Sequence, residues 1–227
     1  MATPRPRLLD LFCGGGGCSV GYYRAGFDVV GVDMVRQPEY PFEFHLGNAL
    51  TYPLDGFDAV HASPPCKAFT PAGNGARQAE TLFPVHDDLL TPMLDRLSGL
   101  TIPWVVENVP NAPMPSGSAI YCGSSFGLDV RRHRLFASNV PVVAPACDHG
   151  RWTPRFQSLD WKARTAGKLA SVVSVHGNLQ GGADTLELRR QAMGIKWMSN
   201  DRLTQAIPPA YTEHIGGQLL HALKAAA

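Results

Sequence analysis

The stretch "DLFCGGGGCSVGYYRAGFDVVGVDM", residues 10–34, decides the fold. It reads as an apolar strand, four glycines, a short helix, a second apolar strand and a terminal acid, Asp33. Glycines are needed where a chain turns tightly and a ligand approaches the backbone. An acid at the end of the second strand can accept hydrogen bonds from the two hydroxyls of a ribose. The stretch therefore predicts a nucleoside-binding β-α-β unit.

The spacing of these glycines disfavours two common phosphate-binding loops. The helix glycine falls at Gly21, so the pattern is not the G-x-G-x-x-G of dinucleotide folds, and no lysine follows the glycines as a phosphate-binding loop requires. A nucleoside ligand without a pyrophosphate fits better. A nicotinamide-dependent oxidoreductase is accordingly disfavoured.

Further apolar runs predict an α/β domain with a mainly parallel sheet. Buried strands are expected at residues 7–12, 27–34, 57–62 and 104–109, and further strands at 120–128 and 131–138. Helices are expected within 77–100, interrupted near Pro84 or Pro92, from about 185 to 193, and over 208–226, where a proline opens the first turn.

Length and composition suit one sizeable globular domain. The chain has 227 residues, of which 44% are hydrophobic and 17% charged. It has no run near the roughly 20 apolar residues of a membrane span and no export signal, so we expect a cytoplasmic protein that does not bind membranes. Its odd number of cysteines, five, predicts free thiols. The sequence leaves the oligomeric state open.

Basic charge is concentrated in one region. Residues 130–170 carry eight Lys or Arg against two acids, although the whole chain has a net charge of only +1. Trp152, Phe156 and Trp161 are interleaved with this charge, a combination that suits a polyanion whose bases can stack. The alternative is a solvated basic face with its tryptophans turned into the core. We divide the chain into a core at 1–137, a basic target-recognition region at 138–180 and C-terminal helices at 181–227 that complete the core.

A cysteine stands in an unusual place in "SPPCKAFT", residues 63–70. Cys66 follows two prolines on a stiffened turn directly after the apolar run at 57–62. Because Pro64 and Pro65 argue against continuation of the strand, the thiol is expected to be accessible as a nucleophile rather than buried as a small hydrophobe. A thiolate on such a turn is a candidate nucleophile for covalent catalysis.

Five short motifs in order resemble the cytosine-C5 DNA methyltransferases that use S-adenosylmethionine. They are "DLFCGGGG", "SPPC", "ENV", "RRHR" and "AIPPAYTEHIG", spread over residues 10–217. The chain departs from the family pattern at Lys67, Val130, Thr204 and Gln205. Only about fifty residues separate "RRHRLF" from the C-terminal helices, where the family inserts a larger domain, so the chain looks most like the small enzymes of phages and prophages.

The resemblance implies a Rossmann-like methyltransferase fold and a role for each matching residue. Cys66 would be the nucleophile, Glu107 would bind the base at N3 and its amine, and Arg132 and Arg134 would hold the base O2 and a phosphate. S-adenosyl-L-methionine would contact Phe12, Cys13, Gly15, Gly17, Asp33, Met34, Asn48, Ala49, Pro65, Gln205 and Ala206. Double-stranded DNA would contact Lys67, Arg151, Trp152, Arg155, Lys162, Arg164 and Lys168, with the target base flipped out of the stack.

Two alternatives to DNA methylation remain open, the same chemistry on RNA and a non-catalytic DNA-binding protein that keeps the fold. The presence of Cys66, Glu107 and Arg134 counts against the second. A partial zinc site is visible in Cys122, Cys147 and His149, but the spacing offers no fourth ligand, so we expect no metal.

Overall fold

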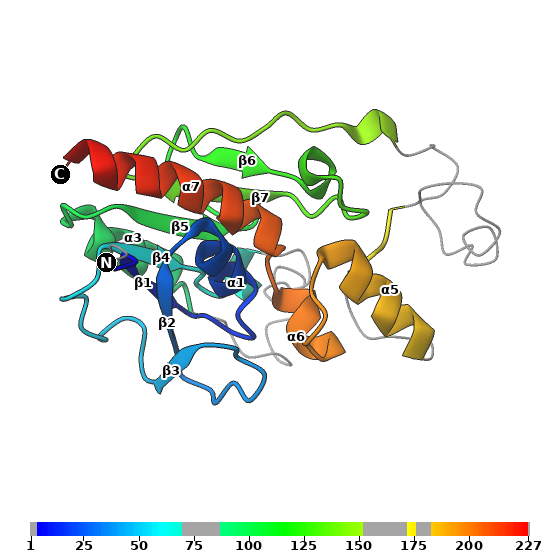
Figure 1. Ribbon diagram of the computed structural model, residues 1–227, viewed down its shortest axis with the longest axis horizontal. Coiled ribbons are helices and arrows are strands. Elements are labelled where there is room, and N and C mark those ends of the chain that lie inside the picture. The colour runs from blue at the N-terminus through cyan, green and yellow to red at the C-terminus, as the bar shows by residue number, and fades with distance from the viewer. Residues whose placement is uncertain (1–3, 70–86, 152–171, 176–182, 227) are drawn as a thin grey trace, which may run out of the picture.

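The structure is a computed structural model that describes residues 4–69, 87–151, 172–175 and 183–226. Its described strands form one sheet in the order β3-β2-β1-β4-β5-β7-β6 (Figure 1). The strands are β1 Arg7–Leu11, β2 Asp28–Asp33, β3 Glu43–Leu46, β4 Ala59–Ala62, β5 Trp104–Asn108, β6 Ala119–Tyr121 and β7 Arg134–Ser138. The pairs among β1 to β5 are parallel, whereas β7 runs antiparallel to both β5 and β6. The predicted α/β fold with a mainly parallel sheet is confirmed.

Helices cover both faces of this sheet. The α-helices are α1 Gly17–Ala25, α3 Leu90–Ser98, α5 Ala183–Met193, α6 Asn200–Gln205 and α7 Pro209–Ala226, and the short 3-10 helices are η1 Lys67–Phe69, η2 Gly123–Phe126 and η3 His149–Arg151. Along β1, Leu8 packs in the cluster of α1 and α7, whereas Leu9 and Leu11 pack in the cluster of α3. This alternation explains why the parallel strands are apolar throughout.

The chain's last helix lies directly against α1, which follows the glycine loop. The Thr212 hydroxyl donates to the Cys18 carbonyl at 2.8 Å. A Cβ at Gly21 would collide with this hydroxyl and with the Pro209 carbonyl, so only glycine allows the two helices to approach so closely. The helices α1 and α7 thus pack together in one layer.

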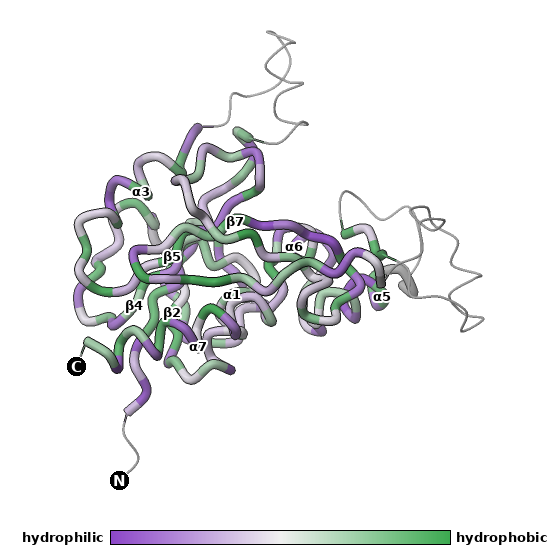
Figure 2. The backbone as a smooth tube through the Cα atoms, turned by 90° about the horizontal axis from the view of Figure 1, so that it is seen from above, coloured by the Kyte–Doolittle hydropathy of each residue, from purple (hydrophilic) through white to green (hydrophobic). Residues whose placement is uncertain are grey.

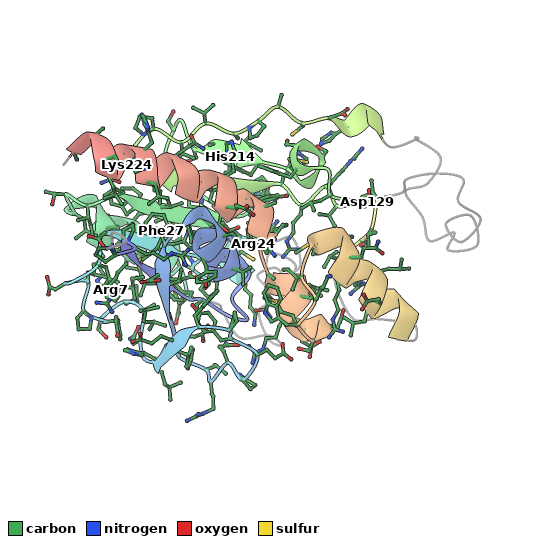
Figure 3. All side chains as sticks on the ribbon, in the orientation of Figure 1. Arg7, Arg24, Phe27, Asp129, His214 and Lys224 are labelled. Atoms are coloured by element: carbon green, nitrogen blue, oxygen red, sulfur yellow. The ribbon has the colours of Figure 1, made fainter. Side chains whose placement is uncertain are left out.

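A smaller apolar cluster involves α5 and α6, which lie near each other at one end of the described chain (Figure 2). Met193 and Ile195, at the end of α5, pack with Leu203 of α6, Val130 and Val175. Figure 3 shows Asp129 on the loop before β7, and its carbonyl accepts a hydrogen bond from the Val173 backbone at 2.6 Å. The cluster therefore attaches α5, α6 and the segment 172–175 to the edge of the main domain.

Most predicted elements are confirmed, with three differences. Residues 77–86 of the segment expected to be helical, including Pro84, lie outside the described residues. The described helix begins at Leu90 because Asp88 accepts hydrogen bonds from the Leu90 and Thr91 backbones, and Pro92 lies in its first turn without interrupting it. The strand expected at 120–128 ends at Tyr121, and the chain then forms the 3-10 helix η2 from Gly123. The strand β3 and the helix α6 were not predicted. In the part of the chain that is described, no helix is long and apolar enough to cross a membrane.

Candidate active site

The candidate site lies at one edge of the sheet, where several loops meet. The parallel strands β1, β2, β4 and β5 place their carboxyl ends there, which is where α/β folds bind ligands. Because β7 is antiparallel to β5, its first residue, Arg134, lies at the same edge. The topology therefore brings together motifs that are far apart in the sequence.

The Cys66 loop is held in place from two neighbouring strands. The Ser63 backbone donates to the Leu11 carbonyl at 3.1 Å, and the buried Asn108 amide donates to the Pro64 carbonyl at 3.1 Å. Cys66 itself is half-buried, and its carbonyl accepts the Phe69 backbone at 2.9 Å at the start of η1. Asn108 belongs to the "ENV" motif, and its role as an anchor of the Pro-Cys loop was not predicted.

Glu107 lies beside this thiol and pairs with an arginine. Arg134 Nε lies 2.9 Å from Glu107 Oε1, and both side chains are almost buried. Burial raises the pKa of Glu107, while Arg134, Arg132 and a hydrogen bond from Ser63 oppose that rise. Burial and the nearby Glu107 carboxylate raise the pKa of Cys66, whereas Arg134 and Arg132 lower it. The structure thus brings the four predicted catalytic residues within electrostatic reach of one another.

A chain of polar side chains continues from this pair into the core. Tyr22 Oη lies 2.9 Å from His61 Nδ1, and His61 Nε2 lies 2.8 Å from Ser63 Oγ. Burial lowers the pKa of His61 to about 3, so the ring is neutral and bonds its two neighbours through one donor and one acceptor. This network was not predicted, because His61 lies within an apolar run whose pattern indicates only a strand.

Arg132 makes contacts other than those expected. Its Nη1 donates to the Val175 carbonyl at 3.3 Å and its Nη2 to the Thr204 carbonyl at 2.7 Å. Burial lowers its pKa to about 9, so it remains charged near neutral pH. The family resemblance implied that Arg132 would hold the base together with Arg134, and this stays a prediction. In the structure a buried guanidinium needs partners, and backbone carbonyls of the C-terminal part supply them.

The glycine loop has the strain and the open space that a ligand site requires. Among the described residues, Phe12 is the one non-glycine residue with a positive φ, 59°. Such strain costs about 1–3 kcal/mol and clusters at functional sites. Gly14 also has a positive φ, and a Cβ there would meet no protein atom within 4 Å. The Asp33 carboxylate accepts hydrogen bonds from the Gly14 backbone at 3.1 Å and the Val35 backbone at 2.9 Å.

A Cβ added at either of the two glycines predicted to contact a cofactor would meet protein atoms. A Cβ at Gly15 would lie 3.0 Å from Met198, and one at Gly17 would collide with the Ile207 carbonyl. The Trp197 indole also donates to the Gly15 carbonyl at 2.9 Å. Packing of the C-terminal part therefore explains these two glycines, while Gly14, which was not predicted, opens toward free space.

The remaining predicted cofactor residues differ in their exposure. Met34 is 64% exposed directly after Asp33, and Asn48 is exposed two residues beyond β3. Pro65 and Gln205 are exposed, Ala206 is half-buried, and Cys13 and Ala49 are buried. An exposed thioether beside a carboxylate that can accept ribose hydroxyls fits the adenosine part of S-adenosylmethionine. The residues present therefore fit this cofactor.

Only two of the predicted DNA contacts lie among the described residues. Lys67 is exposed in η1, next to Cys66, and Arg151 ends η3. Outside the described residues lie Trp152, Arg155, Lys162, Arg164 and Lys168. A cleft of about 160 Å³ is lined by residues 130–132 and 172–175, so Arg132 forms part of its wall.

Comparison with known proteins gives matches in structure but not in sequence. No protein-family profile matches the chain, and neither does any curated protein. A protein assigned as a DNA modification methyltransferase of an E. coli prophage has a TM-score of 0.58 at 15% identity, over 97% of this chain and 99% of the other. The S. pombe Dnmt2 methyltransferase has a TM-score of 0.58 at 12% identity, and the Entamoeba histolytica methyltransferase EhMeth has a TM-score of 0.57 at 11% identity. Both matches cover 97% of this chain and 99% of the other. The chain therefore shares its α/β fold with these methyltransferases.

Proposed function

We propose that the protein transfers a methyl group from S-adenosylmethionine to C5 of cytosine in DNA. The observation that carries the proposal is the cluster at the sheet edge, in which the half-buried Cys66 lies beside the Glu107–Arg134 pair. A nucleophile, a carboxyl group and a guanidinium are the three groups that nucleophilic activation of a pyrimidine needs. The fold shared with the prophage protein, which is assigned to DNA modification, supports DNA as the substrate.

In the proposed reaction the Cys66 thiolate adds to C6 of a cytosine that has left the duplex stack. Glu107 bonds the base at N3 and at its exocyclic amine, and the burial that raises its pKa favours uptake of a proton from solvent at this position as negative charge develops on the ring. Arg134 holds Glu107 in position and faces the base O2. S-adenosylmethionine would supply the methyl group to C5 and would leave as S-adenosylhomocysteine. Loss of the C5 proton to solvent and elimination of Cys66 then restore the free thiol.

In the free protein the surroundings of Cys66 favour its thiol form, because its pKa is raised. Burial and Glu107 disfavour the thiolate, while Arg134 and Arg132 favour it. A cationic sulfonium beside the loop would add to the favourable side. Cys66 would therefore be activated when cofactor and base are both present, which protects the thiol in the free enzyme.

The direct test incubates the protein with S-adenosylmethionine that carries a labelled methyl group. Duplex DNA, single-stranded RNA and transfer RNA are separate arms, and digested product is analysed for 5-methylcytosine. We expect the label in DNA, as 5-methylcytosine, and no transfer by Cys66→Ala. Label only in RNA would overturn the DNA assignment, and label on an exocyclic nitrogen would overturn the proposed chemistry.

A further inference from the structure

Four metal-binding side chains meet at the outer end of the β6–β7 pair. They are Cys122, His133, Cys147 and His149, and their four candidate ligand atoms all lie within 4.8 Å of one another. Three of these residues were visible in the sequence as a partial site. The fourth, His133, stands inside "RRHR", where the flanking arginines suggest a different role.

The fold accounts for their convergence. Tyr121 and Arg134 are register partners in the antiparallel β6–β7 pair, so the next position brings Cys122 opposite His133. The extended segment after β7 returns past this end, where η3 begins at His149. The Ser124 hydroxyl accepts the Asp148 backbone at 3.1 Å, which fixes the returning segment between Cys147 and His149. The register of β6 and β7 and the hydrogen bond to Ser124 therefore bring the four side chains close together.

Two sulfur–nitrogen distances match tetrahedral coordination. Cys122 Sγ lies 3.4 Å from His149 Nε2, and Cys147 Sγ lies 3.6 Å from His133 Nε2. Tetrahedral zinc with Zn–S near 2.3 Å and Zn–N near 2.0–2.1 Å separates sulfur from nitrogen by about 3.5 Å. Two sulfur and two imidazole ligands are a set that structural zinc sites use, and they leave no open position for substrate. We propose that these four side chains bind one zinc ion in a closed, structural site.

Zinc binding would release two protons and leave the site without net charge. The Cys122 thiol now lies 3.0 Å from the Arg131 carbonyl, to which it can donate its proton. One Zn²⁺ displaces the protons of Cys122 and Cys147 to solvent, and the resulting centre of two thiolates, two neutral imidazoles and the ion carries no net charge. The Ser124 hydroxyl donates to Cys122 Sγ at 3.2 Å and continues to do so to the thiolate, as an outer-shell partner of the metal.

The site would fix the basic region to the catalytic edge. His133 directly precedes Arg134, the partner of Glu107, and His149 opens the last described turn before residues 152–171. One ion would thus join the strand that carries Arg134 to the start of the segment expected to contact DNA. The metal site does not depend on the proposed reaction, since its ligands are distinct from Cys66 and Glu107.

Metal content and cobalt spectroscopy test the proposal without any assay of activity. We expect one zinc per chain in wild-type protein purified without chelators, and the same in Cys66→Ser, which serves as a cysteine control outside the tetrad. Cys147→Ser and His133→Ala should each lose most of it. Cobalt(II) added to metal-free protein should give the intense visible bands of a tetrahedral thiolate site in wild type but not in Cys147→Ser. An unchanged zinc content in Cys147→Ser, or a cobalt spectrum without thiolate bands, would overturn the proposal.

Alkylation of the wild-type protein supplies a second readout that needs no variant. Cys147 is exposed, so without metal it should react readily with iodoacetamide, and bound zinc should slow that reaction until a chelator is added. Peptide mass analysis distinguishes the outcomes. Equal labelling of Cys147 with and without zinc would overturn the metal site. A Cys122–Cys147 disulfide in the purified protein, detected as a peptide mass lower by two hydrogens, would also overturn it.

Discussion

Asp10 allows the effect of burial beneath the glycine loop to be tested quantitatively. Its carboxyl group is completely buried, and its Oδ2 accepts a hydrogen bond from the Ser19 hydroxyl. Its Oδ1 has no hydrogen-bond partner in the part of the chain that is described. Burial raises its pKa from an ordinary 3.8 to about 7, against the effect of the Ser19 hydrogen bond and with a smaller contribution from Asp33.

The sign and size of the effect on stability follow. Between the two pKa values the folded chain keeps a proton that the unfolded chain releases, so the free energy of unfolding falls as the pH rises. The fall is about 1.4 kcal/mol for each pH unit in this interval, so about 4 kcal/mol is lost by the time the pH passes 7. Asp10→Asn cannot ionise and lacks this loss, although its buried amide adds a penalty of about 1–3 kcal/mol that does not depend on pH.

Urea unfolding of the cofactor-free protein from pH 5 to pH 8 measures this difference. We expect wild type to lose stability relative to Asp10→Asn by about 1.4 kcal/mol per pH unit until the pH reaches about 7, after which the difference should level off. Asp55→Asn, which changes an exposed carboxylate, is the control and should follow wild type at every pH. Parallel curves for wild type and Asp10→Asn would refute the reasoning.

Three further predictions follow from the site and its supports. Asp33→Asn should weaken S-adenosylmethionine binding about ten- to a hundredfold in calorimetry, because it removes a charge-assisted acceptor, and unchanged affinity would remove Asp33 from the site. Gly216→Ala should destabilise the fold in thermal unfolding, since its Cβ would lie 2.6 Å from Ala25. At the adjacent Gly217 a Cβ meets open space, so Gly217→Ala should raise the free energy of unfolding by up to about 1 kcal/mol. Equal effects of the two variants would contradict the packing of α7 on α1. Glu107→Gln should speed alkylation of Cys66 by removing a charge that raises its pKa, yet slow methyl transfer, and slower alkylation would contradict the electrostatics of the site.

Much of the fold could be predicted because its strands are apolar on both faces. The runs at β1, β2, β4 and β5 lie between helices and have no polar alternation, so their burial is visible in the sequence. The edge strand β3 lacks this signal, since its residues are largely exposed and it gains its order from pairing with β2. The helix α6 has only six residues, too few to show a periodic pattern.

The candidate site was predictable where a residue type alone carries the chemistry. Cys66, Glu107 and Arg134 follow from their motifs and from the ends of strands that carry them. The partners of Arg132 could not be predicted, because Val175 and Thr204 reach it only through tertiary packing. For the same reason the sequence could not distinguish glycines that face the C-terminal part, such as Gly15, from Gly14, which faces open space. The convergence of His133 on three distant ligands likewise depends on the register of β6 and β7.

Covalent trapping of Cys66 tests the central claim most directly. A duplex in which 5-fluorocytosine replaces cytosine cannot release fluorine as it would release the C5 proton, so the enzyme should remain attached after methyl transfer. With S-adenosylmethionine present, we expect a complex that survives denaturation and whose modified peptide contains Cys66, and we expect none with Cys66→Ala. Methylation of ordinary DNA by Cys66→Ala, or a trapped peptide that contains a different residue, would contradict the account.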